Sequence, residues 1–329
     1  MNRTLTRNRV VSLIAGVLGT ITIVGSATQA QTYPSKPIEF VAQSSPGGGT
    51  DLFSRPITDM LTKEKIFSQP FINANRVGGN GVVAYNYIKS KRGDPHVVMA
   101  IATDAVLTSA SWPELDLPLS TFTPLAMFAQ DPQAVAVRAE SKFTTMKELV
   151  EGSKSEATGL TAGITGPTGA GRLTLYLLER EAGAKFRFVT FKGGGDAVLA
   201  TLGGHVEVTT ENMSEMLPLV ESKKMRMLAV TGERRFAQAP NIPTLKELGY
   251  NIIAATGRGF SMPAGVPKEA AAAMEAALKR VYDSPAYKEY SECNLFENNY
   301  LNSTEFAQYL VSSRGRQAEF LKAIGVVKL

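Results

Sequence analysis

Three glycine-rich loops are the parts of this sequence best suited to bind a small molecule. They cover residues 46–51 (PGGGTD), 163–171 (GITGPTGAG) and 192–196 (KGGGD), and each precedes a stretch with helical character. Glycine lets backbone amides approach a ligand closely, and a helix N-terminus carries unpaired N–H groups and roughly half a positive charge. Loops of this kind can hold a carboxylate without an arginine.

The presence of two such loops in different halves of the chain favours a binding site over simple turns. Any one loop alone could be only a tight turn into a helix, and this interpretation is favoured for 192–196. In open α/β sheets, however, ligands lie outside the carboxyl ends of the strands, so 46–51 and 165–171 could face one cleft. Asp51 is expected mainly to cap the following helix at the wall of that cleft, a role worth about 0.5 to 2 kcal/mol.

Strands and helices alternate around these loops. Helical stretches include 52–63, 145–153 and 171–182, and Pro56 is expected to delay the start of the first or to kink it. The alternation predicts mostly parallel sheets with helices on both faces. The strand-like runs are 36–43, 96–102, 133–138, 159–164, 187–191, 206–210 and 227–231.

The last third of the chain reads as helical. Pro267 is suitably placed in the first turn of a helix at 268–282. Asn302 and Glu305 form a capping-box pattern at the start of a final helix, and Gly325 suits the position just after its end. These helices are interpreted as scaffold.

Length and the first thirty residues indicate an exported protein with two lobes. A chain of 329 residues exceeds the roughly 250 to 300 at which single cores stop growing. Three arginines precede an uncharged apolar run at 10–27 and small residues up to Ala30, which predicts a signal peptide at 1–30 and a periplasmic location. An uncleaved anchor is the alternative. Removal of three arginines lowers the formal charge from +5 to +2, too little to indicate nucleic-acid binding.

The sequence lacks the common signatures of catalysis. It has no G-x-S-x-G, H-E-x-x-H, Walker or complete G-x-G-x-x-G pattern, so no catalytic residue, cofactor or metal is predicted. His96 and His205 are interpreted as satisfied structural histidines. Cys293 is the one cysteine and is expected to be buried and inert. Absence of motifs lowers the probability of an enzyme without excluding one.

With these segments in order, the chain resembles the Bug-type solute-binding receptors of tripartite tricarboxylate transporters. The resemblance covers nearly all of the chain after residue 32, and the order and spacing of its segments are more specific than any one of them. The segments are YPSKPI at 33–38, PGGGTDLFSR at 46–55, FKGGGDA at 191–197, LGGHV at 202–206, LAVT at 228–231, APNIPT at 239–244 and MPAGVP at 262–267.

The resemblance implies a two-lobed, periplasmic-binding-protein-like α/β fold that closes on a carboxylated ligand. The first lobe would hold 31–132 and 253–329, and the second 133–252. The chain departs from many relatives at Ser44, where they carry an aromatic residue, and at Arg172, where they carry a histidine. A stretch that contains tryptophan in relatives is replaced here by 256–260, in which the Arg258-Gly259 pair is closer to the tricarboxylate-binding branch.

The predicted function is capture of a di- or tricarboxylate or an aromatic carboxylate by a monomeric receptor that serves membrane transporter subunits. Arg172 and Arg258 suggest more than one ligand carboxylate, although Arg172 could equally be a solvated surface residue and Arg258 could instead pin a loop. The alternatives are an exported enzyme that uses Asp51 and Arg172, and a sensing partner of a membrane kinase. The predicted ligand-binding residues are Ser45, Pro46, Gly47, Gly48, Gly49, Thr50, Asp51, Thr103, Thr165, Gly166, Thr168, Gly169, Ala170, Gly171, Arg172, Asn212 and Arg258.

Overall fold

A computed structural model describes residues 33–326 of the chain. The predicted signal peptide at 1–30 lies outside the described residues. Within 33–326, no helix combines the length and the apolar character that crossing a bilayer requires.

Ten strands of the described residues form one sheet, in the order β2-β1-β3-β9-β4-β7-β5-β6, with β10 and β8 also paired to β4. The first half-sheet, as we call it, contains β1, β2, β3, β9, β10 and the beginning of β4; the second half-sheet contains β5, β6, β7, β8 and the end of β4. The bounds are β1 Ile38–Ala42, β2 Phe71–Asn75, β3 Val97–Ala102, β4 Phe122–Arg138, β5 Leu160–Thr165, β6 Phe186–Phe191, β7 Val208–Asn212, β8 Met225–Val230, β9 Ala255–Pro263 and β10 Glu297–Leu301.

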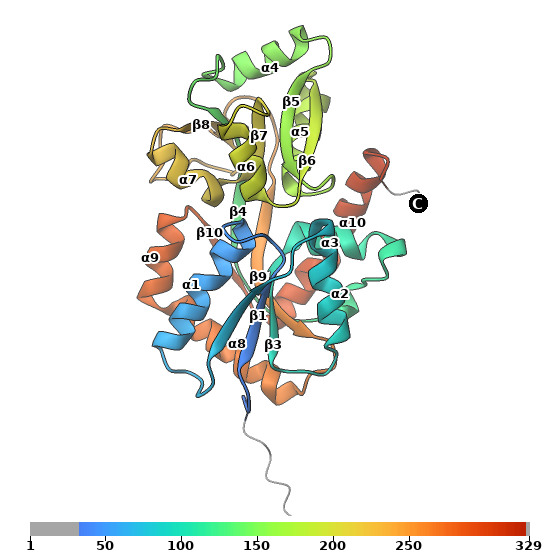
Figure 1. Ribbon diagram of the computed structural model, residues 1–329, viewed down its shortest axis with the longest axis vertical. Coiled ribbons are helices and arrows are strands. Elements are labelled where there is room, and N and C mark those ends of the chain that lie inside the picture. The colour runs from blue at the N-terminus through green and yellow to red at the C-terminus, as the bar shows by residue number, and fades with distance from the viewer. Residues whose placement is uncertain (1–32, 327–329) are drawn as a thin grey trace, which may run out of the picture. The chain divides into compact units, whose positions relative to one another are not determined.

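Helices cover both faces of each half-sheet, as predicted. On the first half-sheet, α1, α8 and α9 pack on one face, and α2, α3 and α10 on the other. On the second, α4 and α5 pack on one face and α6 and α7 on the other (Figure 1). The bounds are α1 Gly49–Lys63, α2 Val82–Ser90, α3 Thr103–Ala110, α4 Met146–Ser155, α5 Ala170–Ala182, α6 Gly194–Leu202, α7 Met213–Glu221, α8 Lys268–Asp283, α9 Pro285–Cys293 and α10 Ser303–Ala323, with short 3₁₀ turns at η1 Gly79–Gly81, η2 Pro113–Leu115 and η3 Leu119–Thr121.

The long strand β4 joins the two half-sheets. It pairs with β9 up to Pro132, and from Gln133 onward it pairs with β7 and β8. The sheet is parallel at its two ends, in β2-β1-β3 and β6-β5-β7, and antiparallel at β9, β4, β8 and β10. The prediction of mostly parallel sheets is therefore wrong at the centre, because the chain crosses between the half-sheets in both directions there.

Strand β9 was not predicted from the sequence, because it contains two glycines. Gly257 and Gly259 lower the β propensity of Ala255–Pro263. A Cβ at Gly259 would lie only 2.5 Å from the backbone oxygen of Ala126 on β4. The glycine is thus required by the close approach of two backbones at the centre of the sheet.

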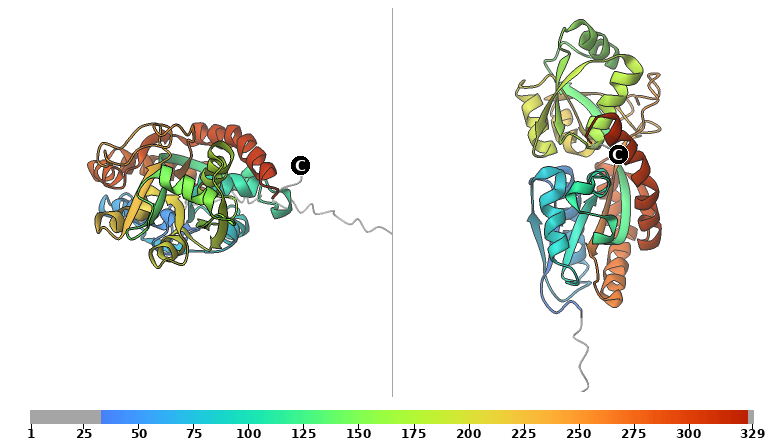
Figure 2. Two further views of the ribbon diagram at one scale, coloured as in Figure 1. Left: turned by 90° about the horizontal axis from the view of Figure 1, so that it is seen from above. Right: turned by 90° about the vertical axis from the view of Figure 1, so that its right-hand side faces the viewer.

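The C-terminal helix begins and ends as predicted. The Asn302 side chain accepts from the Thr304 and Glu305 amides, Glu305 accepts from the Asn302 amide, and Gly325 has a positive φ of 74°. The helix packs on α3 and β4 (Figure 2), and near its end the Phe320 ring lies 5.8 Å from that of Tyr176 on α5. The helix therefore contacts elements of both half-sheets.

Three single-residue predictions have different outcomes. His96 hydrogen-bonds to the Ser35 backbone and to Asp94, so its structural role is confirmed. His205 is exposed instead of packed. The prediction that Cys293 is buried is wrong: it is the exposed last residue of α9.

Pro56 lies within α1, which begins at Gly49, earlier than expected, and continues past the proline. A proline has no N–H, so the carbonyl of Leu52, four residues earlier, loses its helical donor. The Tyr290 hydroxyl of α9 donates to that carbonyl at 2.8 Å. A tertiary hydrogen bond thus replaces the missing helical one.

We expect Tyr290→Phe to destabilise the protein by about 1 to 3 kcal/mol, because it leaves the Leu52 carbonyl without a donor. In a Pro56→Ala background the N–H of Ala at position 56 can donate to the Leu52 carbonyl. Tyr290→Phe should then lower the free energy of unfolding much less. Urea unfolding of the two single variants and the double variant measures the coupling. Equal costs in both backgrounds would contradict this account.

Candidate functional site

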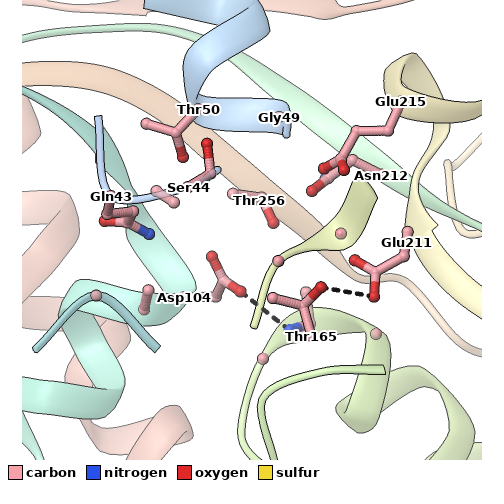
Figure 3. A pocket seen from close by; sticks show the side chains of 18 of the residues that line it. Gln43, Ser44, Gly49, Thr50, Asp104, Thr165, Glu211, Asn212, Glu215 and Thr256 are labelled. Atoms are coloured by element: carbon pink, nitrogen blue, oxygen red, sulfur yellow. Dashed lines mark hydrogen bonds between the residues drawn. The ribbon is translucent and has the colours of Figure 1, made fainter. Parts of the chain in front are cut away.

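A small cavity lies where the ends of both half-sheets meet, and residues of both line it. Its volume is about 70 Å³, well below the 300 Å³ or more of pockets that hold drug-sized ligands. It suits a small solute. The lining residues are Gln43, Ser44, Gly49, Thr50, Gly81, Ala102, Asp104, Ala105, Gln133, Thr165, Gly169, Ala170, Gly171, Lys192, Gly193, Gly194, Glu211, Asn212, Glu215, Thr256 and Arg258 (Figure 3).

Three helices begin at this cavity: α1 at Gly49, α5 at Ala170 and α6 at Gly194. The loops at 46–51 and 165–171 therefore both reach it. The loop at 192–196, interpreted from sequence as a helix-entry turn, does lead into α6, but Gly193 and Gly194 also line the cavity. All three glycine loops thus bring backbone amides to one place.

Close packing explains one of these glycines. A Cβ at Gly171 would overlap the backbone oxygen of Thr210 on β7. Only glycine lets the first turn of α5 lie against the end of β7, which brings the 165–171 loop next to Glu211 and Asn212.

The structure divides the predicted ligand residues into two groups. Those that line the cavity are Gly49, Thr50, Thr165, Gly169, Ala170, Gly171, Asn212 and Arg258. Those that lie outside its lining are Ser45, Pro46, Gly47, Gly48, Asp51, Thr103, Gly166, Thr168 and Arg172.

Asp51 orders the first loop. Its Oδ2 accepts from the Gly47 amide at 3.0 Å, and its Oδ1 accepts from Arg55 and Asn75 at 2.8 Å each. Burial alone would raise its pKa, but the hydrogen bonds from Arg55, Gly47 and Asn75 outweigh burial and lower the pKa below its usual value. Asp51 lies in the first turn of α1, whose N-cap is Gly48 with no side-chain cap hydrogen bond, so its side chain orders the preceding loop and does not cap the helix as favoured from the sequence.

Arg172 does not line the cavity. Its guanidinium lies 3.8 Å from the centroid of the Phe188 ring and 3.6 Å from the Glu179 carboxylate. Burial lowers its pKa. The hypothesis of a second cleft arginine is therefore not supported by this geometry. Gly166 and Thr168 line a neighbouring cavity of about 510 Å³.

Arg258 lines the cavity but is bonded to another side chain of the protein. It is 2% exposed, and its Nε and Nη2 donate to Asp131 Oδ2 at 3.0 and 2.6 Å. The same carboxylate oxygen accepts from the Ser214 hydroxyl at 2.8 Å. Thr103, outside the lining, accepts from the neighbouring Gly257 amide at 2.8 Å and so holds the strand that carries Arg258.

Three carboxyl groups of the lining were missed by the sequence analysis. Asp104 lies in the first turn of α3, which follows β3, Glu211 lies near the end of β7, and Glu215 lies in the first turn of α7. A signal was present, since the rule that ligands lie outside the carboxyl ends of strands applies equally to predicted strands 96–102 and 206–210. The residues just after those strands would have been candidates.

Two of these acids accept hydrogen bonds from other residues of the lining. Asp104 Oδ2 accepts from the Ala170 amide at 3.0 Å, and Glu211 Oε1 accepts from the Thr165 hydroxyl at 2.8 Å. Burial raises the pKa of Glu215 to about 7, and burial together with the Glu215 charge raises the pKa of Glu211 well above its usual value. At pH values between 4.5 and about 7, Glu211 and Glu215 therefore hold protons that the unfolded chain would release.

A raised carboxyl pKa makes stability depend on pH. The stabilisation is complete below the unfolded value of 4.5 and is lost as pH rises through the folded value of about 7. We expect the melting temperature of the ligand-free protein to fall across this window, and to fall less in Glu215→Gln. Differential scanning calorimetry at several pH values measures both. Glu221→Gln, at the exposed end of the same helix, is the control and should keep the wild-type slope.

Comparison with known proteins places this chain and its fold in a family. A 28% identical relative, "UPF0065 protein in gbd 5'region" from Cupriavidus necator, aligns over 95% of this chain and 97% of its own. Among solved structures, "Structure of periplasmic binding protein BugD" has a TM-score of 0.84 at 22% identity and covers 90% of this chain and 100% of its own. "R. palustris Rpa4515 with adipate" has the same TM-score and coverage at 21% identity. The predicted periplasmic-binding-protein-like fold is confirmed.

Residues 55–326 match the family described as "Tripartite tricarboxylate transporter family receptor". That match covers most of the chain and confirms the resemblance drawn from the sequence. The family description names its members as receptors of a transporter, and one neighbour of the same fold was solved with adipate. The chain belongs to the tripartite tricarboxylate transporter receptors, which are periplasmic solute-binding proteins and not enzymes.

Proposed function

We propose that this chain is an exported, monomeric receptor that captures a small carboxylated solute in the cavity and delivers it to a membrane transporter. The observation that carries the proposal is the convergence of three helix N-termini, at Gly49, Ala170 and Gly194, on one small cavity. The N-terminal end of a helix carries partial positive charge, which favours anions, and two of these amides already donate to carboxyl groups, Ala170 to Asp104 and Gly49 to Glu215. A neighbour of the same fold was solved with adipate, which is consistent with a carboxylated ligand.

We further propose that the half-sheets correspond to two lobes, 31–132 with 253–329 and 133–252. Support comes from the hydrogen bonds at the crossing, where β4 changes partners between Pro132 and Gln133. Thr231 pairs with Gln133 through both backbone and side chain, and its hydroxyl also donates to the Ala254 carbonyl. A few residues therefore carry the chain between the two half-sheets in each direction.

The alternative functions have less support. Family membership argues against the enzyme, and Asp51 and Arg172, the residues named for it, do not share the cavity. A sensing role for the receptor remains compatible with the same binding site. Native mass spectrometry of freshly purified protein tests the main proposal first, since it should find a co-purified organic acid.

Substitution of two neighbouring glycines, Gly194 and Gly195, tests whether this cavity is the binding site. A Cβ at Gly194 would overlap Glu215 Oε2, whereas one at Gly195 meets nothing closer than the Gly47 oxygen at 3.9 Å. Gly194→Ala should weaken binding of the co-purified acid, or of adipate, by at least about 10-fold, equivalent to about 1.4 kcal/mol. Gly195→Ala should change the affinity by less than about threefold. Isothermal titration calorimetry measures both, and equal effects would rule out this cavity.

Ligand binding should bring the two lobes together, because a site lined from both half-sheets is complete only when they approach. The radius of gyration from small-angle X-ray scattering should decrease at saturating ligand. A profile that does not change at saturation would show that the pocket is formed before the ligand arrives.

A further inference from the structure

A glutamine in the lining of the cavity is held in one orientation by a buried tyrosine. Gln43 directly follows β1 and lines the cavity from the first half-sheet. The Tyr85 hydroxyl of α2 donates a hydrogen bond to Gln43 Oε1. Tyr85 is 0% exposed, and its ring packs edge-on against Phe122 with 5.6 Å between the ring centroids. The group that orients the glutamine amide is therefore itself held in place by packing.

Gly81 leaves the space that the tyrosine hydroxyl occupies. It has a φ of 94°, in the left-handed region that favours glycine. A Cβ at this position would lie 2.8 Å from the Tyr85 hydroxyl oxygen, which is too close for the ring to stay where it is. The contact between Tyr85 and Gln43 thus depends on a glycine that also lines the cavity.

The direction of this hydrogen bond decides which end of the amide faces the cavity. Burial, together with the charge of Asp104, raises the pKa of Tyr85 well above its usual value, so the hydroxyl keeps its proton and can donate it. Because it donates to the amide oxygen, the amide nitrogen of Gln43 points the other way. Figure 3 shows this nitrogen directed into the space that the labelled side chains surround. If the amide turned over, its oxygen would point toward the side where the Asp104 carboxylate lies, which is unfavourable.

The nitrogen of this amide is left with unused donors. A primary amide nitrogen carries two N–H groups, and among the described residues none accepts a hydrogen bond from Gln43 Nε2. The side chain is partly buried. A donor fixed at the wall of a binding cavity rewards a ligand that places an acceptor there and disfavours one that places a methyl group there.

We propose that Gln43 is a specificity-determining residue whose Nε2 donates to an oxygen of the solute, and that Tyr85 is the positioning residue that turns these donors into the cavity. The oxygen belongs to a part of the solute other than the carboxylate held by the glycine loops. It is an acceptor, either of a second carboxylate or of an uncharged group such as a hydroxyl. This inference rests on the proposed function for the identity of the cavity.

The test uses three probes with the same four-carbon chain, which suits a small cavity: succinate, 4-hydroxybutanoate and butanoate. Isothermal titration calorimetry of the mature protein should find at least one of the two probes with a second oxygen group about 10-fold tighter than butanoate. Tighter binding of succinate would identify a second carboxylate at Gln43, and tighter binding of 4-hydroxybutanoate an uncharged oxygen. Gln43→Leu should remove this preference, to within about threefold, and leave the affinity for butanoate nearly unchanged.

A second substitution keeps the hydrogen bond from Tyr85. Gln43→Glu has the same shape and still accepts from the Tyr85 hydroxyl, but it replaces the two N–H donors by an acceptor. It should also remove the preference, and should weaken succinate more than butanoate because of like charge. Gln238→Leu makes the same change as Gln43→Leu at an exposed turn and should have no effect.

The role of Tyr85 is tested by its coupling to Gln43. Tyr85→Phe should reduce the preference for the second oxygen by about threefold or more in the wild type, and should not change the affinities further in a Gln43→Leu background. A merely structural role for Tyr85 predicts the same loss of affinity in both backgrounds. Tyr87→Phe, on the same helix, removes a hydroxyl that donates to Glu39 outside the cavity lining and should leave the preference intact.

Other outcomes separate this proposal from the proposed function. An unchanged preference in both Gln43 variants, while Gly194→Ala still weakens binding, would overturn the role of Gln43 and keep the cavity as the binding site. No effect of either Gln43 variant or of Gly194→Ala would overturn both. Failure of all three probes to bind at millimolar concentration would overturn the role of Gln43, and the co-purified acid would still test the proposed function.

Discussion

The buried ion pair between Asp131 and Arg258 determines how the central part of this structure is arranged. Asp131 lies on β4 where that strand leaves the first half-sheet, and Arg258 lies on β9 beside it. The same aspartate accepts from Ser214 through its side chain and from Asn212 through its backbone oxygen. One carboxylate therefore ties both crossing strands to the start of α7.

The position of the cavity's acids follows from that connection. Glu215 lies one residue after Ser214, so the hydrogen bond from Ser214 to Asp131 fixes the turn of α7 that presents Glu215 to Gly49 and Gly194. On the opposite side, Asp104 at the start of α3 reaches the Ala170 amide of α5. Each half-sheet thus contributes a carboxyl to a helix N-terminus of the other. These contacts hold the two halves together at the same amides that a ligand anion would use.

The sequence predicted the glycine loops because their chemistry is local. Backbone amides at the start of α1 and α5 need only a glycine run followed by a helix, and both can be read from neighbouring residues. The roles of Arg172 and Arg258 depend on partners on other elements: Arg172 stacks on Phe188 of β6, and Arg258 pairs with Asp131 of β4. No spacing in the sequence identifies those partners. Likewise β9 was missed because its glycines serve a long-range backbone contact, and α1 continues past Pro56 because Tyr290, far along the chain, supplies the missing donor.

The same ion pair decides what Arg258 can contribute to recognition. Removing one member of a buried pair leaves an uncompensated charge and costs roughly 3 to 5 kcal/mol. A single charge-assisted hydrogen bond to a ligand contributes only about 1.5 to 3 kcal/mol. A ligand carboxylate therefore cannot draw the guanidinium away from Asp131, which is 0% exposed and has no other cation bonded to it among the described residues. Arg258 acts as a fixed wall of the cavity whose charge is already balanced.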